Sequence, residues 1–375
     1  MAESARPRAL VVADDFARDH VLTEAALRRL SAVAQVTVLG DDDEGRILRE
    51  VGRSTALLVA GWDTRLPYLD AERLAGAPLL RLAGAGQDGR WRFLDVREAL
   101  RRGVVCSDSS GAMGPVVAEF ALGLVLCCLR DIPGRHALVA SGGWWDGWED
   151  AGTGAGAGAW PTTLAGRRVG IVGMGGIGRH LVRLLSGAGC DTAVCSSWLS
   201  PAAAGDLGVE LVSSVRQLAR RSEILVVATQ PRADTAGLVD ADAIAELPAG
   251  AVVVLVGRAA TVDLPALLAR AAAGKLRVGL DVHPEEPLPR DHPVRGMPNV
   301  VHTPHVAGRT LEANRLIFEE LVGEVERVLA GAAPRWATTA ERVARVLVGR
   351  RPPQLAAPDG DLRQSAAHRA TLVDQ

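Results

Sequence analysis

Short apolar runs of strand length alternate with helical stretches along most of the chain. The first series falls between residues 9 and 108, and its runs are ALVVA, QVTVLG, ALLVAG, LLRLAG and GVVCSD. The second series falls between residues 168 and 305, and its runs are RVGIVG, DTAVCSS, EILVVAT, AVVVLVG, RVGLDVH and NVVHTPH. Continuous apolar strands between helices are typical of parallel sheets covered on both faces. The two series therefore predict an α/β protein with two doubly wound parallel-sheet domains.

Longer segments connect and follow the two series. Residues 115–129 predict a buried helix, because the run VVAEFALGLVLCCL is apolar but shorter than the ~20 residues that a membrane span needs. Residues 142–161 are rich in Gly and Trp and predict a loop. After His305, apolar residues recur at helical spacing, which predicts a helix that crosses back to the first domain. The chain end predicts a short helix over 338–348, followed by disorder.

Composition narrows the possible partners and the cellular location. The 375 residues carry a net charge of −2, which predicts no strong attraction to nucleic acid or to an anionic membrane. The five cysteines show no CxxC spacing, so we expect free thiols in a reducing cytosol and no metal site. The N-terminus lacks the apolar core of a signal peptide. A cytoplasmic protein is therefore expected.

The run RVGIVGMGGIG has the spacing of a dinucleotide-binding turn between a strand and a helix. Gly173 would permit the tight turn, Gly175 would let the backbone approach a pyrophosphate, and Gly178 would let the helix pack on the strand. The N-terminus of the following helix would then present N–H groups to the phosphates. This context, and not the glycines alone, predicts a nucleotide site.

The second strand of such a domain usually ends in an acid that binds the adenosine ribose 2′-hydroxyl. Here the residue at that place is Ser196. Serine can bond a hydroxyl and does not repel a 2′-phosphate, yet no arginine lies in residues 196–201 to attract one. NAD and NADP therefore both stay open as the cofactor, with a slight preference for NAD.

Three polar residues follow three later strands, where ligand-binding residues of doubly wound folds gather. They are Arg258, Glu286 and His305. An arginine can hold the carboxylate of a 2-keto acid and polarise its carbonyl. A histidine can give or take a proton near neutral pH, and a glutamate bonded to it would stabilise the imidazolium. We therefore predict a catalytic triad of these residues.

These motifs, in this order, resemble those of the D-isomer-specific 2-hydroxyacid dehydrogenase family. The resemblance also covers PVVAEFALGLVLCCLR, LDVHPEEPLPRDHPV and MPNVVHTPHVAG, and it extends over about residues 57–329. It implies that Arg258 binds substrate, that His305 is the general acid/base and that Glu286 is its partner. It further implies a Rossmann cofactor domain, a flavodoxin-like substrate domain and a homodimer.

The resemblance also implies further binding residues and the domain limits. The expected cofactor contacts are Gly173, Gly175, Gly176, Ile177, Gly178, Ser196, Thr229, Gln230, Val256 and Asp281, the last of which would face the nicotinamide carboxamide. Backbone N–H groups of Ala85 and Gly86 would bind the substrate carboxylate. The expected domains are 1–112 with 308–335 for substrate, 113–307 for NAD(P), and 336–375 as a partly disordered tail.

The leading hypothesis is an NAD(P)-dependent oxidoreductase that interconverts a small 2-keto acid and a D-2-hydroxy acid. A relative acting on formate or phosphite is an alternative within the enzyme class. A protein that senses a nucleotide, in the manner of corepressors with this fold, is an alternative outside it; it would bind cofactor with little turnover.

Overall fold

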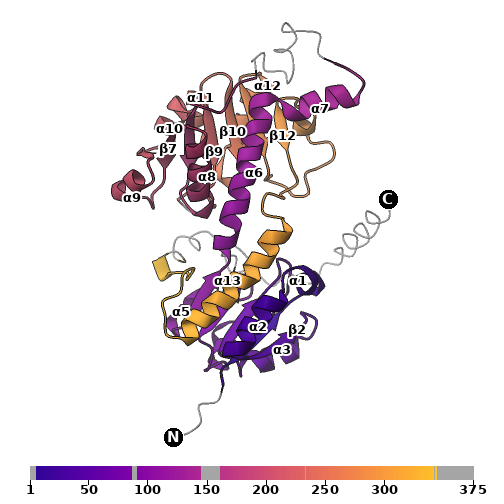
Figure 1. The fold of residues 1–375 in the computed structure, drawn as a ribbon, viewed down its shortest axis with the longest axis vertical. Helices are drawn as coiled ribbons and strands as arrows, with labels where there is room; N and C mark the ends of the chain where they lie inside the picture. The colour runs from indigo at the N-terminus through magenta and orange to yellow at the C-terminus, as the bar shows by residue number, and fades with distance from the viewer. Residues whose placement is uncertain (1–5, 87–90, 145–160, 233, 342, 344–375) are drawn as a thin grey trace.

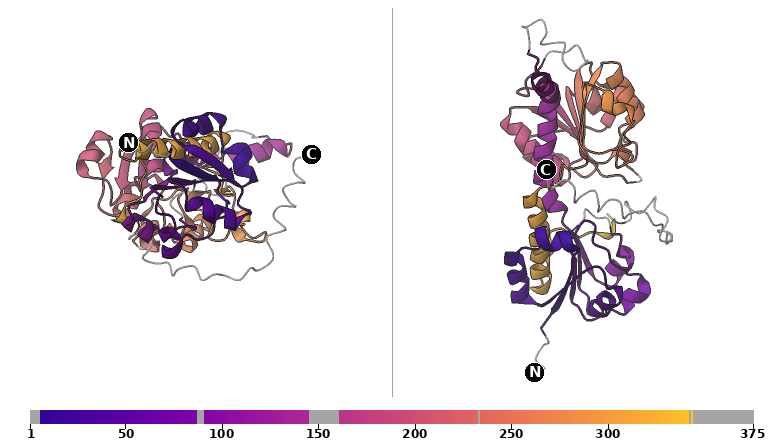
Figure 2. Two further views of the ribbon diagram at one scale, coloured as in Figure 1. Left: turned by 90° about the horizontal axis from the view of Figure 1, so that it is seen from below. Right: turned by 90° about the vertical axis from the view of Figure 1, so that its right-hand side faces the viewer.

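The computed structural model describes residues 6–86, 91–144, 161–232, 234–341 and 343. Two parallel sheets with helices on their faces form the two ends of an elongated molecule (Figure 1), which is narrowest where the two domains meet (Figure 2). The predicted fold class, two doubly wound α/β domains, is confirmed.

The first sheet has five parallel strands in the order β2-β1-β3-β4-β5, the flavodoxin-like arrangement. The strands are β1 Arg8–Val12, β2 Gln35–Leu39, β3 Ala56–Val59, β4 Leu82–Ala85 and β5 Val105–Asp108. The helices are α1 Asp15–His20, α2 Glu24–Val33, α3 Glu44–Val51, α4 Ala71–Ala75 and α5 Val96–Arg101. Each begins after an Asp or Thr whose side chain accepts the N–H three residues later, so its first turn is capped.

The second sheet has seven parallel strands in the order β12-β11-β10-β9-β6-β7-β8. The strands are β6 Arg168–Val172, β7 Asp191–Cys195, β8 Glu210–Leu211, β9 Ile224–Val227, β10 Ala251–Leu255, β11 Leu276–Leu280 and β12 Val300–His302. The helices are α7 Ile132–Ala140, α8 Gly176–Gly187, α9 Pro201–Asp206, α10 Val215–Arg221, α11 Ala241–Glu246 and α12 Leu264–Ala272, with 3-10 turns at Ala259–Thr261 and Pro293–Gly296. The chain reverses its direction of travel across the sheet between β6 and β9, which is where doubly wound folds bind nucleotides.

Every predicted apolar run contains a strand, with two differences in detail. β4 begins only at Leu82, the fourth residue of its run, because Leu79 is 57% exposed and lies before the sheet. The two-residue strand β8 was not predicted, because so short a strand leaves no periodic signal.

The connecting helix α6 spans Ser110–Arg130, which is longer than predicted. By length and composition alone, α6 could cross a membrane, so the prediction that this segment is too short for a membrane span was wrong. It packs instead against α8, β10 and β11, and Ala118, Ala121 and Val125 are fully buried. These contacts make α6 a core helix of the second domain (Figure 1).

Helix α13, Leu311–Leu329, returns from the second domain to the first, as its periodicity predicts. It packs against α2, β4 and β5 and also contacts α6 (Figure 1). The chain then continues along the first sheet: Ala337 pairs with Ser107, and the Thr338 N–H donates to Cys106. The first residues of the expected tail are thus part of the first domain. Residues 344–375, and with them the predicted disorder, lie outside the described residues, as do 145–160 of the predicted loop.

Candidate active site

The glycine-rich turn joins β6 to α8 at the point where the strand order reverses. Gly173 has a φ of +97°, and an added Cβ would lie 3.0 Å from Thr229, so only glycine fits. An added Cβ on Gly178 would lie 2.5 Å from the Gly173 carbonyl oxygen. At Gly175 it would meet nothing within 4 Å. Two glycines therefore close the turn, and the third faces open space.

Helix α8 begins at Gly176 and Ile177 directly after this open position. No side chain caps its N-terminus, in contrast to the capped helices of the first domain. Its first N–H groups therefore remain available to an anion at the positive end of the helix dipole. The turn and the helix together fit a pyrophosphate, so the residues present suit a dinucleotide cofactor.

The other predicted cofactor residues lie at the carboxyl edge of the same sheet. Ser196 follows β7, Thr229 and Gln230 follow β9, and Val256 follows β10. Thr229 and Val256 are 8% and 3% exposed, so backbone atoms would make most of their contacts. Neighbouring strands bring these positions around the turn. Their role as ligands stays a prediction.

Two of the three predicted catalytic residues contact each other. His305 Nδ1 lies 2.7 Å from Glu286 Oε2, and both side chains are about one-third exposed, at 33% and 38%. The other carboxylate oxygen of Glu286 accepts the N–H of His283 at 3.0 Å. Burial raises the pKa of Glu286, but the bonds from His283 and His305 outweigh it, so the pKa lies below its ordinary value. Glu286 is therefore held as a carboxylate beside the imidazole.

The loop that carries His305 is held in an unusual conformation. His305 has a φ of +56°, which residues other than glycine seldom adopt. Asp281, which is 1% exposed, accepts bonds from Thr303 Oγ1 at 2.7 Å and from the N–H groups of Val306 and Ala307 at 2.9 and 3.0 Å. Such a strained backbone conformation persists only where surrounding hydrogen bonds hold it in place, and this is common at functional sites.

Asp281 follows β11 directly, and its carboxylate holds the loop of His305. Its contact with a nicotinamide stays a prediction. Thr303, for which the sequence predicts no role, shares this task through its bond to Asp281. Its place between His302 and His305, directly after a predicted strand, could have drawn attention to it.

Arg258 follows β10, the strand next to β11, which leads to Glu286. Its guanidinium is partly buried and donates to the Gly257 carbonyl at 2.7 Å. The carboxyl ends of β10, β11 and β12 thus carry the three predicted catalytic residues to one edge of the sheet.

The predicted substrate contacts of the first domain are only partly available. Ala85 ends β4 and is 1% exposed. The Gly86 N–H donates to the Val59 carbonyl at 2.7 Å, so this donor is used within the sheet. Residues 87–90, which continue the loop, lie outside the described residues.

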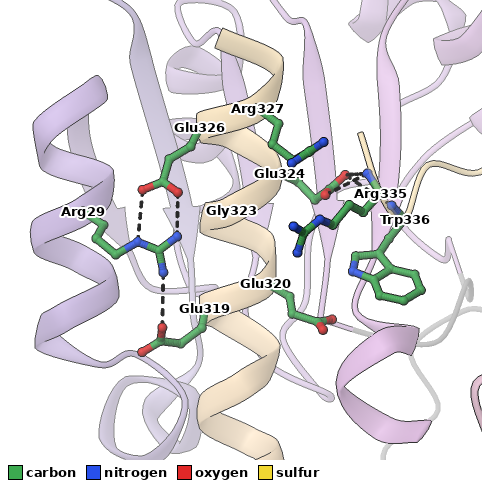
Figure 3. A pocket seen from close by; sticks show the side chains of 9 residues that line it. All are labelled: Arg29, Glu319, Glu320, Gly323, Glu324, Glu326, Arg327, Arg335 and Trp336. Carbon is green, nitrogen blue, oxygen red and sulfur yellow. Dashed lines mark hydrogen bonds and ion pairs between the residues drawn. The ribbon is translucent and has the colours of Figure 1, made fainter. Parts of the chain in front are cut away.

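A separate pocket of about 340 Å³ lies along α13 in the first domain (Figure 3). None of the predicted site residues lines it. Glu319 and Glu326 point to Arg29 on one side of the helix, whereas Glu320 and Glu324 lie toward Trp336 on the other. Among the described residues, no group of three or more His, Cys, Asp or Glu could hold a metal ion.

Comparison with known proteins gives a consistent result. Residues 122–307 match the model of the D-isomer specific 2-hydroxyacid dehydrogenase NAD binding domain. D-3-phosphoglycerate dehydrogenase of Mycobacterium bovis is 32% identical over 314 residues, 83% of this chain but only 56% of that protein. Glyoxylate reductase of Thermofilum pendens is 27% identical over 88% of this chain and 94% of its own. A phosphoglycerate oxidoreductase structure from Rhizobium etli superposes with a TM-score of 0.76 at 26% identity, over 90% of this chain and 99% of that one.

Proposed function

The chain belongs to the D-isomer-specific 2-hydroxyacid dehydrogenase family, and on that premise we propose that it is an NAD(P)-dependent oxidoreductase that interconverts a 2-keto acid and a D-2-hydroxy acid. The observation that carries the proposal is the bonded His305–Glu286 pair at the sheet edge that also holds the glycine turn. A nucleotide-binding protein without proton chemistry has no need of that pair.

The bound nicotinamide would supply or accept a hydride at the substrate carbon. The residues of this chain would handle the charge and the proton. Arg258 would bind the substrate carboxylate with its planar, permanently charged group. His305 would donate a proton to the carbonyl oxygen in the reductive direction, and the Glu286 carboxylate would stabilise the imidazolium before that transfer.

Asp281 has a positioning role in this proposal. Because its bonds hold residues 303–307, it sets the direction of the His305 ring. Glu286 adds the second restraint through Nδ1, which leaves Nε2 for the substrate.

For the domain division, we propose residues 1–112 with 308–341 for substrate and 113–307 for cofactor, supported by the packing of α13 on β4 and β5 and by the pairing of Ala337 with Ser107. We further propose a homodimer formed through the second domain. Helix α7 has no buried residue, and Ile132, Leu138 and Val139 are 50%, 38% and 53% exposed, so a second copy of the chain would cover them. The five free cysteines support a cytoplasmic location.

The test is oxidation of NADH and NADPH by the purified protein with 2-keto acids from glyoxylate to phenylpyruvate. We expect turnover with at least one acid, and its loss in His305→Ala with cofactor binding retained. The matched control is His302→Ala, which removes a histidine at the end of the preceding strand β12 and should keep turnover. Cofactor binding without turnover on any acid would instead favour the nucleotide-sensing protein.

A further inference from the structure

Arg232 reaches across the carboxyl edge of the second sheet. It follows β9, whereas Trp198 follows β7, and β6 with its glycine turn lies between these two strands. The Arg232 Cζ nevertheless lies 5.3 Å from the centroid of the Trp198 ring. Because adjacent strands are about 4.8 Å apart, this contact spans about 10 Å across the end of β6. The guanidinium therefore lies close to the end of β7, where doubly wound nucleotide sites hold the adenosine ribose.

The end of β7 lacks the negative charge that would disfavour a phosphate there. Ser196 stands at that position, and its Oγ accepts the N–H of Trp198 at 3.3 Å. No acid occurs in residues 196–201. A 2′-phosphate on the ribose would thus meet a hydroxyl from β7 and a cation from the segment after β9.

The segment that carries Arg232 is ordered by its own bonds. Thr235 Oγ1 accepts the Arg232 N–H at 2.8 Å and donates to the Gln230 carbonyl at 2.6 Å. The Arg232 side chain is 14% exposed, and its Nε donates to Asp234 at 3.1 Å. Within the described part of the chain this is its one side-chain hydrogen bond, so both terminal nitrogens remain as donors. The Asp234 carboxylate, 47% exposed, offsets part of the charge without occupying those nitrogens.

We propose that Arg232, oriented by Trp198, binds the 2′-phosphate of the adenosine ribose and makes NADP the preferred cofactor. This proposal depends on the nucleotide site of the proposed function and does not depend on the chemistry at His305. It reverses the slight preference for NAD, which depended on the lack of an arginine in residues 196–201. The arginine comes from a segment more than thirty residues later, which no local motif could reveal.

The test is equilibrium binding by calorimetry, with NADPH, NADH, adenosine 2′,5′-bisphosphate and 5′-AMP as ligands. We expect the unaltered protein to bind NADPH at least ~10-fold more tightly than NADH. Arg232→Ala should weaken NADPH and the bisphosphate by ~10- to 100-fold, the usual effect of losing a charge-assisted bond, and should change NADH by less than ~3-fold. Trp198→Ala should weaken NADPH less, because Arg232 remains but is no longer oriented. The matched control is Arg220→Ala, which also removes an arginine paired with a carboxylate in this domain and should change neither affinity.

Each other result has a distinct meaning. Equal NADPH and NADH affinities that Arg232→Ala leaves unchanged would overturn the proposal and leave the dehydrogenase function intact. An equal loss of both cofactors in Arg232→Ala would show a general role in the site and would likewise overturn the specificity. If the unaltered protein binds none of the four ligands, the nucleotide site itself is refuted, and the proposed function falls with it.

Discussion

Glu320 of α13 carries a carboxyl group whose negative charge is only partly compensated by neighbouring groups. Its Oε2 is buried and, among the described residues, has no hydrogen-bond partner, and the Ala112 N–H donates to the carboxylate. Burial raises the pKa of Glu320 to about 7, and the nearby carboxylates of Glu324 and Asp108 act in the same direction, against the bond from Ala112 and the charge of Arg335. Glu320 lies on the Trp336 side of α13 (Figure 3). Glu320→Gln removes the charge that this site disfavours.

The size and sign of the effect follow from proton linkage. The pKa of Glu320 is raised from 4.5 to about 7. Between these two pH values the folded protein keeps a proton that the unfolded chain has already released. The resulting stabilisation is complete below about pH 4.5 and is lost as the pH rises through 7. Over the whole window it amounts to about 3 kcal/mol, and about 2 kcal/mol of it is lost between pH 5.5 and pH 8.5.

The assay is thermal unfolding of the protein and of Glu320→Gln at these two pH values. With an unfolding entropy of about 2.1 cal/mol/K per residue, 2 kcal/mol corresponds to about 2–3 °C for this chain. We expect the Tm of Glu320→Gln, relative to the unaltered protein, to rise by that amount between pH 5.5 and pH 8.5. The control Glu312→Gln changes an exposed glutamate in the first turn of α13, and its Tm difference should stay constant. Parallel Tm curves for Glu320→Gln and the unaltered protein would refute the reasoning.

Three further changes test the site and its support. Arg258→Ala should lower kcat/KM by at least ~100-fold with cofactor affinity within ~3-fold, since the substrate loses its charge-assisted partner; ordinary turnover would remove Arg258 from the site. Glu286→Gln should lower kcat by ~10- to 100-fold in steady-state assays, because the imidazolium loses its carboxylate, and an unchanged kcat would contradict this role. Gly114→Ala places a Cβ 2.9 Å from the Gly176 backbone at the start of α8, so urea unfolding should show a loss of about 1–3 kcal/mol and calorimetry a weaker cofactor affinity. Gly123→Ala, in open space on the same helix, should instead be neutral or stabilising by up to ~1 kcal/mol, and similar results for both variants would reject the packing argument.

The sequence by itself determined the fold class, because buried parallel strands are continuous apolar runs and each run produces a local signal. It also located the glycine turn, since the reasons for Gly173 and Gly178 are local backbone conformation and close packing within one strand-turn-helix unit. The positions of Glu286 and His305 after two strands were enough to predict that they meet, because parallel strands end at a common edge.

The sequence pattern did not predict where α6 begins. The apolar run of α6 begins at Val116, whereas the helix begins at Ser110, directly after β5. The packing of α6 on α8, β10 and β11, which are remote in sequence, decides that this apolar helix belongs to a protein core.

Tertiary structure alone decided the details that set chemistry and specificity. The bonds from Asp281 to the loop of His305 join segments more than twenty residues apart, and they assign that carboxylate a supporting role that spacing did not suggest. The contact of Arg232 with Trp198 depends on the strand order, which places β9 and β7 on either side of β6. Such side-chain contacts across a sheet edge depend on which strands are neighbours, and the local sequence pattern does not determine the strand order.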